Sequence, residues 1–299
     1  MRIAKRIFLF LAINALVVIT ISIVLNLFDV RPFLTAHGLD YRSLMIFCLI
    51  WGMGGALISL SLSRIMAKRM MGVHVIDPHT DDPALARLIS TVYKLAQEAR
   101  LPDMPEVGIY ESPEVNAFAT GPTKRRSLVA VSRGLLQRMS QTELEGVLAH
   151  EITHISNGDM VTMTLLQGVV NAFVMFLARV LALALSAGRG GNKAQASRGS
   201  YMLWVILFEV LFMVLGSLVI AAYSRWREFR ADAGGAELAG KRNMIAALQS
   251  LKALQEKRDL NAEQPAFDAM KISSYRRSPL MKLFSTHPPL EERIARLEN

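Results

Sequence analysis

Long uncharged stretches alternate with polar ones along this chain. Four apolar runs stand out: Ile7 to Phe28, Ser43 to Ser63, Met160 to Gly188 and Gly199 to Ser224. The first two contain no charged residue, whereas Arg179 interrupts the third and Glu209 the fourth. A helix needs about 20 predominantly apolar residues to cross the hydrocarbon core of a bilayer, and each run reaches that length. The pattern therefore predicts four transmembrane helices arranged as two hairpins.

The first run also has the basic start of a signal peptide, with Arg2, Lys5 and Arg6. Its apolar stretch is longer than a signal peptide needs, and no convincing small-residue cleavage site precedes Asp29. A retained membrane anchor is therefore expected. In the second run, the small residues between Gly52 and Ala56 would let another helix pack closely.

The net charge of +9 is concentrated beside the membrane runs. Three basic residues precede the first run, and Arg64, Lys68 and Arg69 follow the second. Since basic residues prefer the cytoplasmic side, both ends of the first hairpin are expected in the cytoplasm. Cys48 is the only cysteine, so no intramolecular disulfide is possible, which agrees with a reducing compartment. The charge alone would also suit nucleic acid, but no nucleic-acid-binding motif accompanies it.

Charged residues leave the topology of the second hairpin open. Its connector, Gly188–Ser200, is rich in glycine and serine and holds three basic residues, which are disfavoured on the outer side. The hairpin is either forced across by the earlier helices or dips into the membrane without spanning it. Arg179 and Glu209 are expected to pair, because a charge inside a membrane usually faces a partner.

The polar stretch from residue 68 to residue 158 has globular character. A helix is expected from Pro83 to about Arg100, capped by Asp81 or Asp82. A second helix is expected to start at the capping box of Ser140 and to end at Asn157-Gly158. Between the helices lie three short strand-like segments: Val107–Tyr110, Asn116–Thr120 and Ser127–Val131. Gly121-Pro122 is a turn signal, so the last two strands are expected to form a hairpin.

These elements give a mainly α fold with a small β-sheet, in which a metalloprotease domain of zincin type is combined with four transmembrane helices. The expected organisation has four parts in chain order. They are an N-terminal transmembrane hairpin (1–67), the first part of a cytoplasmic metalloprotease domain (68–159), a second hairpin (160–224) and the second part of that domain (225–299). The last part is expected to be helical, with a loop near 259–285.

The chemistry is carried by His150-Glu151-Ile-Thr-His154, which matches H-E-x-x-H. Positions four apart share one helix face, so both imidazoles can reach one Zn²⁺. Glu151 lies one step round the helix and can act on a water in the open position of the metal. The surrounding residues are uncharged, and burying such a polar triad without a purpose would be costly. The alternative is an ordinary helix with two hydrogen-bonded histidines.

The third metal ligand is not fixed by this motif. A metzincin would have glycine and histidine where this chain has Asn157 and Met160, so that class is excluded. Four other histidines remain as candidates: His37, His74, His79 and His287. Among carboxylates, Glu228 and Asp232 share a helix face and would suit one ligand and one group that orients a ligating histidine. The alternative is an exposed, charged helix start.

The order of the runs supports Glu228. His154 precedes the second hairpin and Glu228 follows it, so an even number of membrane crossings separates them, as a shared metal requires. Both residues are close in sequence to membrane runs. The substrates are therefore expected to be membrane proteins or their juxtamembrane loops.

With these residues in view, the chain resembles the HtpX family of bacterial inner-membrane zinc metalloproteases, relatives of the CAAX prenyl protease. The resemblance covers nearly the whole chain and rests on six segments: 116–121, 127–132, 149–155, 157–164, 227–234 and 286–290. It implies that Glu228 is the third ligand of a single Zn²⁺ and that the active site faces the cytoplasm. It also implies a role in proteolytic quality control of membrane proteins.

The expected reaction is metal-assisted hydrolysis of a peptide bond, with Glu151 as the general base and Asp232 as the residue that orients a ligating histidine. His287 is a candidate donor to the oxyanion, or else caps the helix that starts at Pro288-Pro289.

Asn116, Ala117 and Phe118 are candidates for an edge strand that pairs with an extended substrate, or else form an ordinary sheet strand. Two rival functions are a non-catalytic zinc-bearing scaffold or holdase and a transporter. The retained Glu151 argues against the scaffold, since zinc binding alone does not need it. The transporter is disfavoured because Arg179 and Glu209 are the only charged residues in the apolar runs, too few polar groups to form a transport path.

Overall fold

The computed structural model describes residues 34–35, 38–187, 198–261 and 283–299. Within these ranges the chain folds as two compact units. One holds the described residues up to Leu60 together with Thr162–Ile220, and is called here the membrane unit. The other holds Ser61–Val161 and Ala221–Asn299, and is called the catalytic unit. The first apolar run, Ile7 to Phe28, lies outside the described residues.

Three helices are long and apolar enough to cross a membrane among the described residues: α2 (Tyr41–Met70), α6 (Asp159–Ala187) and α7 (Arg198–Ala239). They contain the second, third and fourth apolar runs, whose helical character is therefore confirmed. Two short strands, β1 (Leu34–Thr35) and β2 (Gly38–Leu39), precede α2. Most of the connector between α6 and α7 lies outside the described residues.

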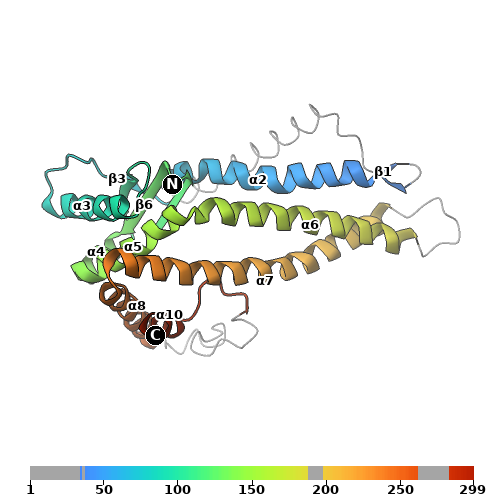
Figure 1. The fold of residues 1–299 in the computed structure, drawn as a ribbon. Coiled ribbons are helices and arrows are strands. Elements are labelled where there is room, and N and C mark those ends of the chain that lie inside the picture. The colour runs from blue at the N-terminus through green and yellow to red at the C-terminus, as the bar shows by residue number, and fades with distance from the viewer. Residues whose placement is uncertain (1–33, 36–37, 188–197, 262–282) are drawn as a thin grey trace. The chain divides into compact units, whose positions relative to one another are not determined.

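Helices α2, α6 and α7 lie side by side in the membrane unit (Figure 1). A Cβ atom added to Gly52 of α2 would lie 2.6 Å from the backbone nitrogen of Ala172 in α6, so only glycine allows this approach. Leu44 and Cys48 are buried beside the same contact. The expected pairing of Arg179 with Glu209 is confirmed, because a guanidinium nitrogen and a carboxylate oxygen lie 2.7 Å apart.

A four-stranded sheet forms the centre of the catalytic unit, in the order β3-β4-β6-β5. The strands are β3 (His74–Val75), β4 (Glu106–Tyr110), β5 (Ala117–Thr123) and β6 (Arg126–Ser132). The pair β4-β6 is parallel, while the other two pairs are antiparallel. Strand β6 is central and buried on both faces, and β5 is an edge.

The hairpin between β5 and β6 is confirmed, but its turn is not where glycine and proline predict it. Gly121 and Pro122 lie inside β5, and the turn falls at Lys124-Arg125. A Cβ atom on Gly121 would lie 2.2 Å from the carbonyl oxygen of Arg126, and its φ is +148°. The glycine therefore marks an irregularity of the strand pair, between Thr120 and Thr123, and not the chain reversal.

Helices cover one face of this sheet and carry the polar motif. Helix α3 (Pro83–Glu98) begins at Asp82, whose carboxylate accepts from the backbone nitrogens of residues 84 and 85. The short α4 (Arg133–Arg138) follows β6, and α5 (Gln141–Asn157) begins with the expected capping box of Ser140 and Glu143. Apolar residues of α3, α4 and α5 form the largest core with β4 and β6. The motif helix is thus fixed against the sheet.

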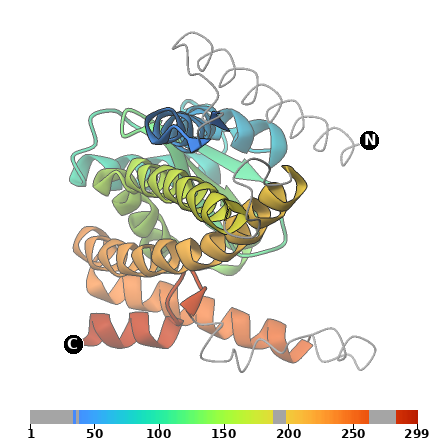
Figure 2. The same ribbon diagram turned by 90° about the vertical axis from the view of Figure 1, so that its right-hand side faces the viewer.

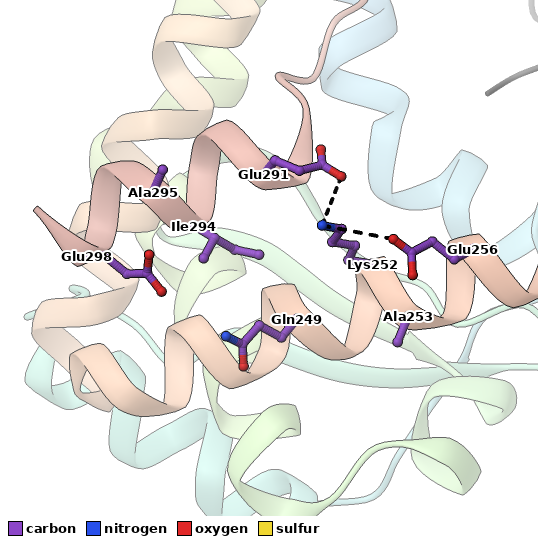
Figure 3. Close-up of a pocket in the computed structure, with 8 residues that line it drawn as sticks. All are labelled: Gln249, Lys252, Ala253, Glu256, Glu291, Ile294, Ala295 and Glu298. Carbon is purple, nitrogen blue, oxygen red and sulfur yellow. Dashed lines mark ion pairs between the residues drawn. The ribbon is translucent and has the colours of Figure 1, made fainter. Parts of the chain in front are cut away.

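The last part of the chain is helical, as expected. Helix α8 (Lys241–Asn261) packs on α5, and α10 (Leu290–Glu298) packs on α8 (Figure 2). The groove between α8 and α10 holds Lys252, which pairs with Glu256 of its own helix and with Glu291 of α10 (Figure 3). The expected loop starts later than residue 259, since α8 continues to Asn261, and most of it lies outside the described residues.

Candidate active site

Two buried histidines on α5 face each other across one turn of the helix. The Nε2 atoms of His150 and His154 lie 3.1 Å apart, and both side chains are about nine-tenths buried. The expected sharing of one helix face is therefore confirmed. The intervening Glu151 is half-buried.

Glu228 on α7 completes this cluster. Its side chain is 1% exposed, with Oε1 lying 3.3 Å from Nε2 of His154 and Oε2 lying 3.5 Å from Nε2 of His150. The approach of the two helices depends on glycine. A Cβ atom on Gly234 would lie 2.4 Å from a methyl carbon of Thr153, and one on Gly235 would lie 3.1 Å from the backbone nitrogen of His150.

The three side chains His150, His154 and Glu228 fit a metal ion. Their donor atoms all lie within 4.8 Å of one another. A tetrahedral zinc ion with nitrogen and oxygen ligands at about 2.0–2.1 Å needs donors roughly 3.3–3.4 Å apart. The two Nε2 atoms lie 3.1 Å apart, and each lies close to that value from one oxygen of Glu228, His154 at 3.3 Å from Oε1 and His150 at 3.5 Å from Oε2. Two imidazoles and a carboxylate are also a donor set that zinc prefers.

Carboxylates hold the far side of each imidazole. Nδ1 of His150 lies 3.0 Å from Asp232, and Nδ1 of His154 lies 2.7 Å from Asp159. A carboxylate only accepts, so each Nδ1 donates and each Nε2 keeps its lone pair for a metal. The pairing of Asp232 with a histidine matches its expected orienting role. Asp159 was missed, because it follows the motif helix across the left-handed turn at Gly158.

Arg293 of α10 was also missed. Although it is a charged residue, it is 7% exposed. It donates two hydrogen bonds to Asp232, at 2.6 and 2.7 Å, and its third nitrogen lies 3.8 Å from Glu228. The sequence signal was the apolar spacing of the last helix, in which Arg293 shares the buried face. Arg227 supplies a further positive charge, 3.2 Å from Glu228.

His287 contacts the cluster from the segment before α10. Its Nδ1 atom lies 2.8 Å from Oε2 of Glu228, and its side chain is 62% exposed. The alternative role as a helix cap is wrong for this geometry, because α10 begins after Pro289 without a side-chain cap. The other candidate histidines do not join the cluster among the described residues, and His37 lies outside them.

The carboxylates favour positive charge on the histidines. Burial lowers the pKa of His150, but hydrogen bonds to Asp232 and Glu228 outweigh it and raise the pKa to about 9. Burial also lowers the pKa of His154, and bonds to Asp159 and Glu228 raise it above its usual value. Three acidic side chains and two arginines surround the two imidazoles, and the carboxylates that contact the imidazole nitrogens directly suit a divalent cation.

Comparison with known proteins shows the family to which the chain is similar. Residues 84–299 match the family model of Peptidase family M48. The chain is 52% identical over 302 residues to the protease HtpX homolog of Bacillus subtilis (strain 168), with 99% of each chain covered. It is 48% identical over 294 residues to protease HtpX of Pasteurella multocida (strain Pm70), with 98% of this chain and 97% of that protein covered.

Among solved structures, the chain is similar to S. mikatae Ste24p, with a TM-score of 0.64 and 19% identity. The match covers 99% of this chain but only 64% of that one, so the chain spans less than two thirds of the length of Ste24p. At this identity the likeness shows a shared fold.

Proposed function

The chain belongs to peptidase family M48, within the HtpX proteases, and we propose that it is a zinc endopeptidase that cleaves membrane proteins at the cytoplasmic side of the bacterial inner membrane. Membership makes it a multi-span membrane metallopeptidase. The proposal adds the zinc ion, the roles of individual residues, the orientation and the substrates. One observation carries it, namely the convergence of His150, His154 and Glu228 beside Glu151.

His150, His154 and Glu228 would hold one zinc ion through Nε2, Nε2 and a carboxylate oxygen. When bound, zinc lowers the pKa of a coordinated water and polarises the scissile carbonyl. Asp232 and Asp159 fix both histidines as Nδ1–H tautomers, with Nε2 facing the centre of the cluster. Arg293 keeps Asp232 ionised in its buried position, since it donates two hydrogen bonds to that carboxylate.

Glu151 is the proposed general base. It takes a proton from the attacking water and passes it to the leaving amine. Its half-buried position next to two buried histidines leaves it in reach of both water and the substrate. His287 donates through Nδ1 to Glu228. In its imidazolium form the ring also carries a proton on Nε2, and that N–H is the proposed donor to the oxyanion of the substrate.

The substrate is proposed to bind as an added strand along β5. This strand is an edge of the sheet, and α5 packs against it. Asn116 lies at its start, where its backbone is held by Ser132, and Ala117 and Phe118 lead along it. An edge strand offers unpaired backbone groups to an extended polypeptide and so accepts many sequences. Such binding suits unfolded or misfolded proteins.

The location of the site follows from sequence distance and charge. Only a few residues separate His154 and Glu228 from the apolar runs, so cleavage is proposed close to the membrane surface. The basic residues that flank the first hairpin favour a cytoplasmic location for both of its ends. The proposed fold is of zincin type with four membrane helices, divided at residues 67, 159 and 224. This arrangement suits quality control of membrane proteins.

The direct test compares the wild type with Glu151→Gln in mild detergent, after chelation and reloading with zinc. Bound zinc is measured together with cleavage of an unfolded soluble polypeptide. We expect one zinc per chain in both proteins and cleavage by the wild type alone. Equal cleavage by both would remove Glu151 as the base. If neither cleaves while zinc stays bound, the alternative of a non-catalytic scaffold or holdase replaces the proposal.

A further inference from the structure

Arg225 of α7 ties the segment before α10 to the helix that carries Glu228. Its Nη1 atom donates to two backbone carbonyls, those of Leu283 and Ser285, each at 2.8 Å. Two carbonyls held by one guanidinium nitrogen fix both the position and the direction of this short stretch of chain. Leu283 is a helical residue, whereas Ser285 lies outside any helix or strand, so the guanidinium supplies a hydrogen-bond partner that regular structure does not give the Ser285 carbonyl.

The clamped segment leads directly to His287. Only Thr286 lies between Ser285 and His287, and the Ser285 hydroxyl donates to the His287 carbonyl at 2.7 Å. On the other side of His287 the chain is held by the buried Pro288 and by α10. His287 therefore lies between two anchors, and Arg225 is the one on its N-terminal side.

The ring of His287 needs these anchors because little packs around it. Its side chain is 62% exposed, yet its Nδ1 atom is placed 2.8 Å from Glu228. An exposed ring on an unanchored backbone would spend much of its time in other rotamers, since fixing it costs conformational entropy. Arg225 and Glu228 are three residues apart on α7, so the clamp and its target lie one helical turn from each other.

We propose that Arg225 is a positioning residue of the peptidase site, which acts through the backbone at Leu283 and Ser285 to hold His287 on Glu228. This inference rests on the proposed function only for the role of Glu228 as a metal ligand. An orienting partner of a metal ligand commonly contributes about 10–100-fold to metal affinity or activity. Loss of the two hydrogen bonds from Arg225 should therefore weaken zinc binding as well as lower the rate of the reaction.

The test uses the full chain in detergent, loaded with zinc, and measures the rate at which a chelator removes the metal. Arg225→Met removes both donors but keeps the apolar stem. We expect it to release zinc about 10-fold faster than the wild type and to lower kcat more than it raises KM. Arg225→Lys should restore most of the wild-type rate, because an ammonium group has three donors for two carbonyls. Arg242→Ala, at an exposed arginine of α8, is the matched control.

A double-mutant cycle decides whether Arg225 acts through His287. If it does, His287→Ala alone speeds zinc release as much as Arg225→Met, and combining the two adds nothing. Multiplied effects in the double variant, or a zinc-release rate that only Arg225→Met changes, would overturn the proposal. If Arg225→Met does not fold, Arg225→Gln takes its place. The Gln side chain is polar, but it is too short for its NH₂ group to reach the two carbonyls. Zinc release is read without any substrate, so it stands even where cleavage fails.

Discussion

Arg293 and Asp232 form a two-bond pair in the interior of the catalytic unit, at 2.6 and 2.7 Å, although 61 residues separate them in the sequence. Asp232 in turn holds His150. Burial lowers the pKa of Arg293, but the bonds to Asp232 outweigh it and raise the pKa. The last helix of the chain is thereby connected to a histidine of the H-E-x-x-H motif.

Removing Arg293 alone should lower the free energy of unfolding more than removing both Arg293 and Asp232. Arg293→Leu leaves the buried Asp232 without its partner, which typically costs about 3–5 kcal/mol of unfolding free energy. We expect a marked fall in the apparent Tm, and partial recovery in Arg293→Leu with Asp232→Leu. Thermal unfolding in detergent gives both values. Arg242→Ala, at an exposed arginine of α8, is the control. If the double variant were no better than the single one, the buried charge would not be the cause.

Asp159 should control how tightly the metal is held. Its carboxylate lies 2.7 Å from Nδ1 of His154, so Asp159→Asn removes a charge-assisted bond and weakens the lone pair of Nε2. We expect zinc affinity to fall by about 10–100-fold with the fold retained. Competition with a chelator measures it. Asp103→Asn, at a half-exposed residue paired with Arg125, serves as the control. An unchanged affinity would mean that His154 needs no partner.

The ion pair of the membrane unit should tolerate a swap better than a single change. Arg179 and Glu209 lie 2.7 Å apart on two apolar helices. Arg179→Glu or Glu209→Arg places two like charges together in an apolar setting, which should lower the yield of folded protein. Combining the two restores the attraction, so we expect the swap to be milder than either single change. Detergent-stable yield by size-exclusion chromatography is the measure, and a swap worse than both would contradict it.

Glu106 should stabilise the catalytic unit only above acidic pH. Burial raises its pKa, but hydrogen bonds to Lys68 and Arg64 prevail and lower it below 4.5. When the pKa is lower in the folded state than in the unfolded state, the stabilisation is fully present above the unfolded pKa. It is lost as the pH falls through the folded pKa. Glu106→Gln should thus lower the apparent Tm at pH 7.

The same comparison near pH 3.5 checks the sign. At that pH the difference in apparent Tm between wild type and Glu106→Gln should be smaller. The glutamate of the unfolded chain is then largely protonated, so the folded ion pair stabilises the protein less. Glu292→Gln, at an exposed residue of α10, should show no gap at either pH. A gap that widens in acid would show that the ion pair with Arg64 and Lys68 is not its source.

Much of the local structure was readable from the sequence, because local chemistry determines it. Three of the apolar runs form long helices, the capping box at Ser140 starts α5, and the spacing of His150 and His154 places both on one face. Each of these depends on residues within a few positions of one another. The predicted turn at Gly121-Pro122 was wrong because this glycine is required by a contact with the neighbouring strand, which a local pattern does not show.

The composition of the candidate site required the tertiary structure. Spacing left the third member of the cluster open between carboxylates and distant histidines, and the resemblance pointed to Glu228. Asp159 and the hydrogen bonds of Arg225 could not be read from spacing, because each acts on a partner from another element. The spacing of α10 puts Arg293 on the buried face of that helix but does not say that its partner is Asp232. By itself, the sequence determined the H-E-x-x-H motif and a short set of candidates for its partners. Packing of α5, α7 and α10 decided which of them meet, since such contacts depend on how helices approach and not on the pattern along any one of them.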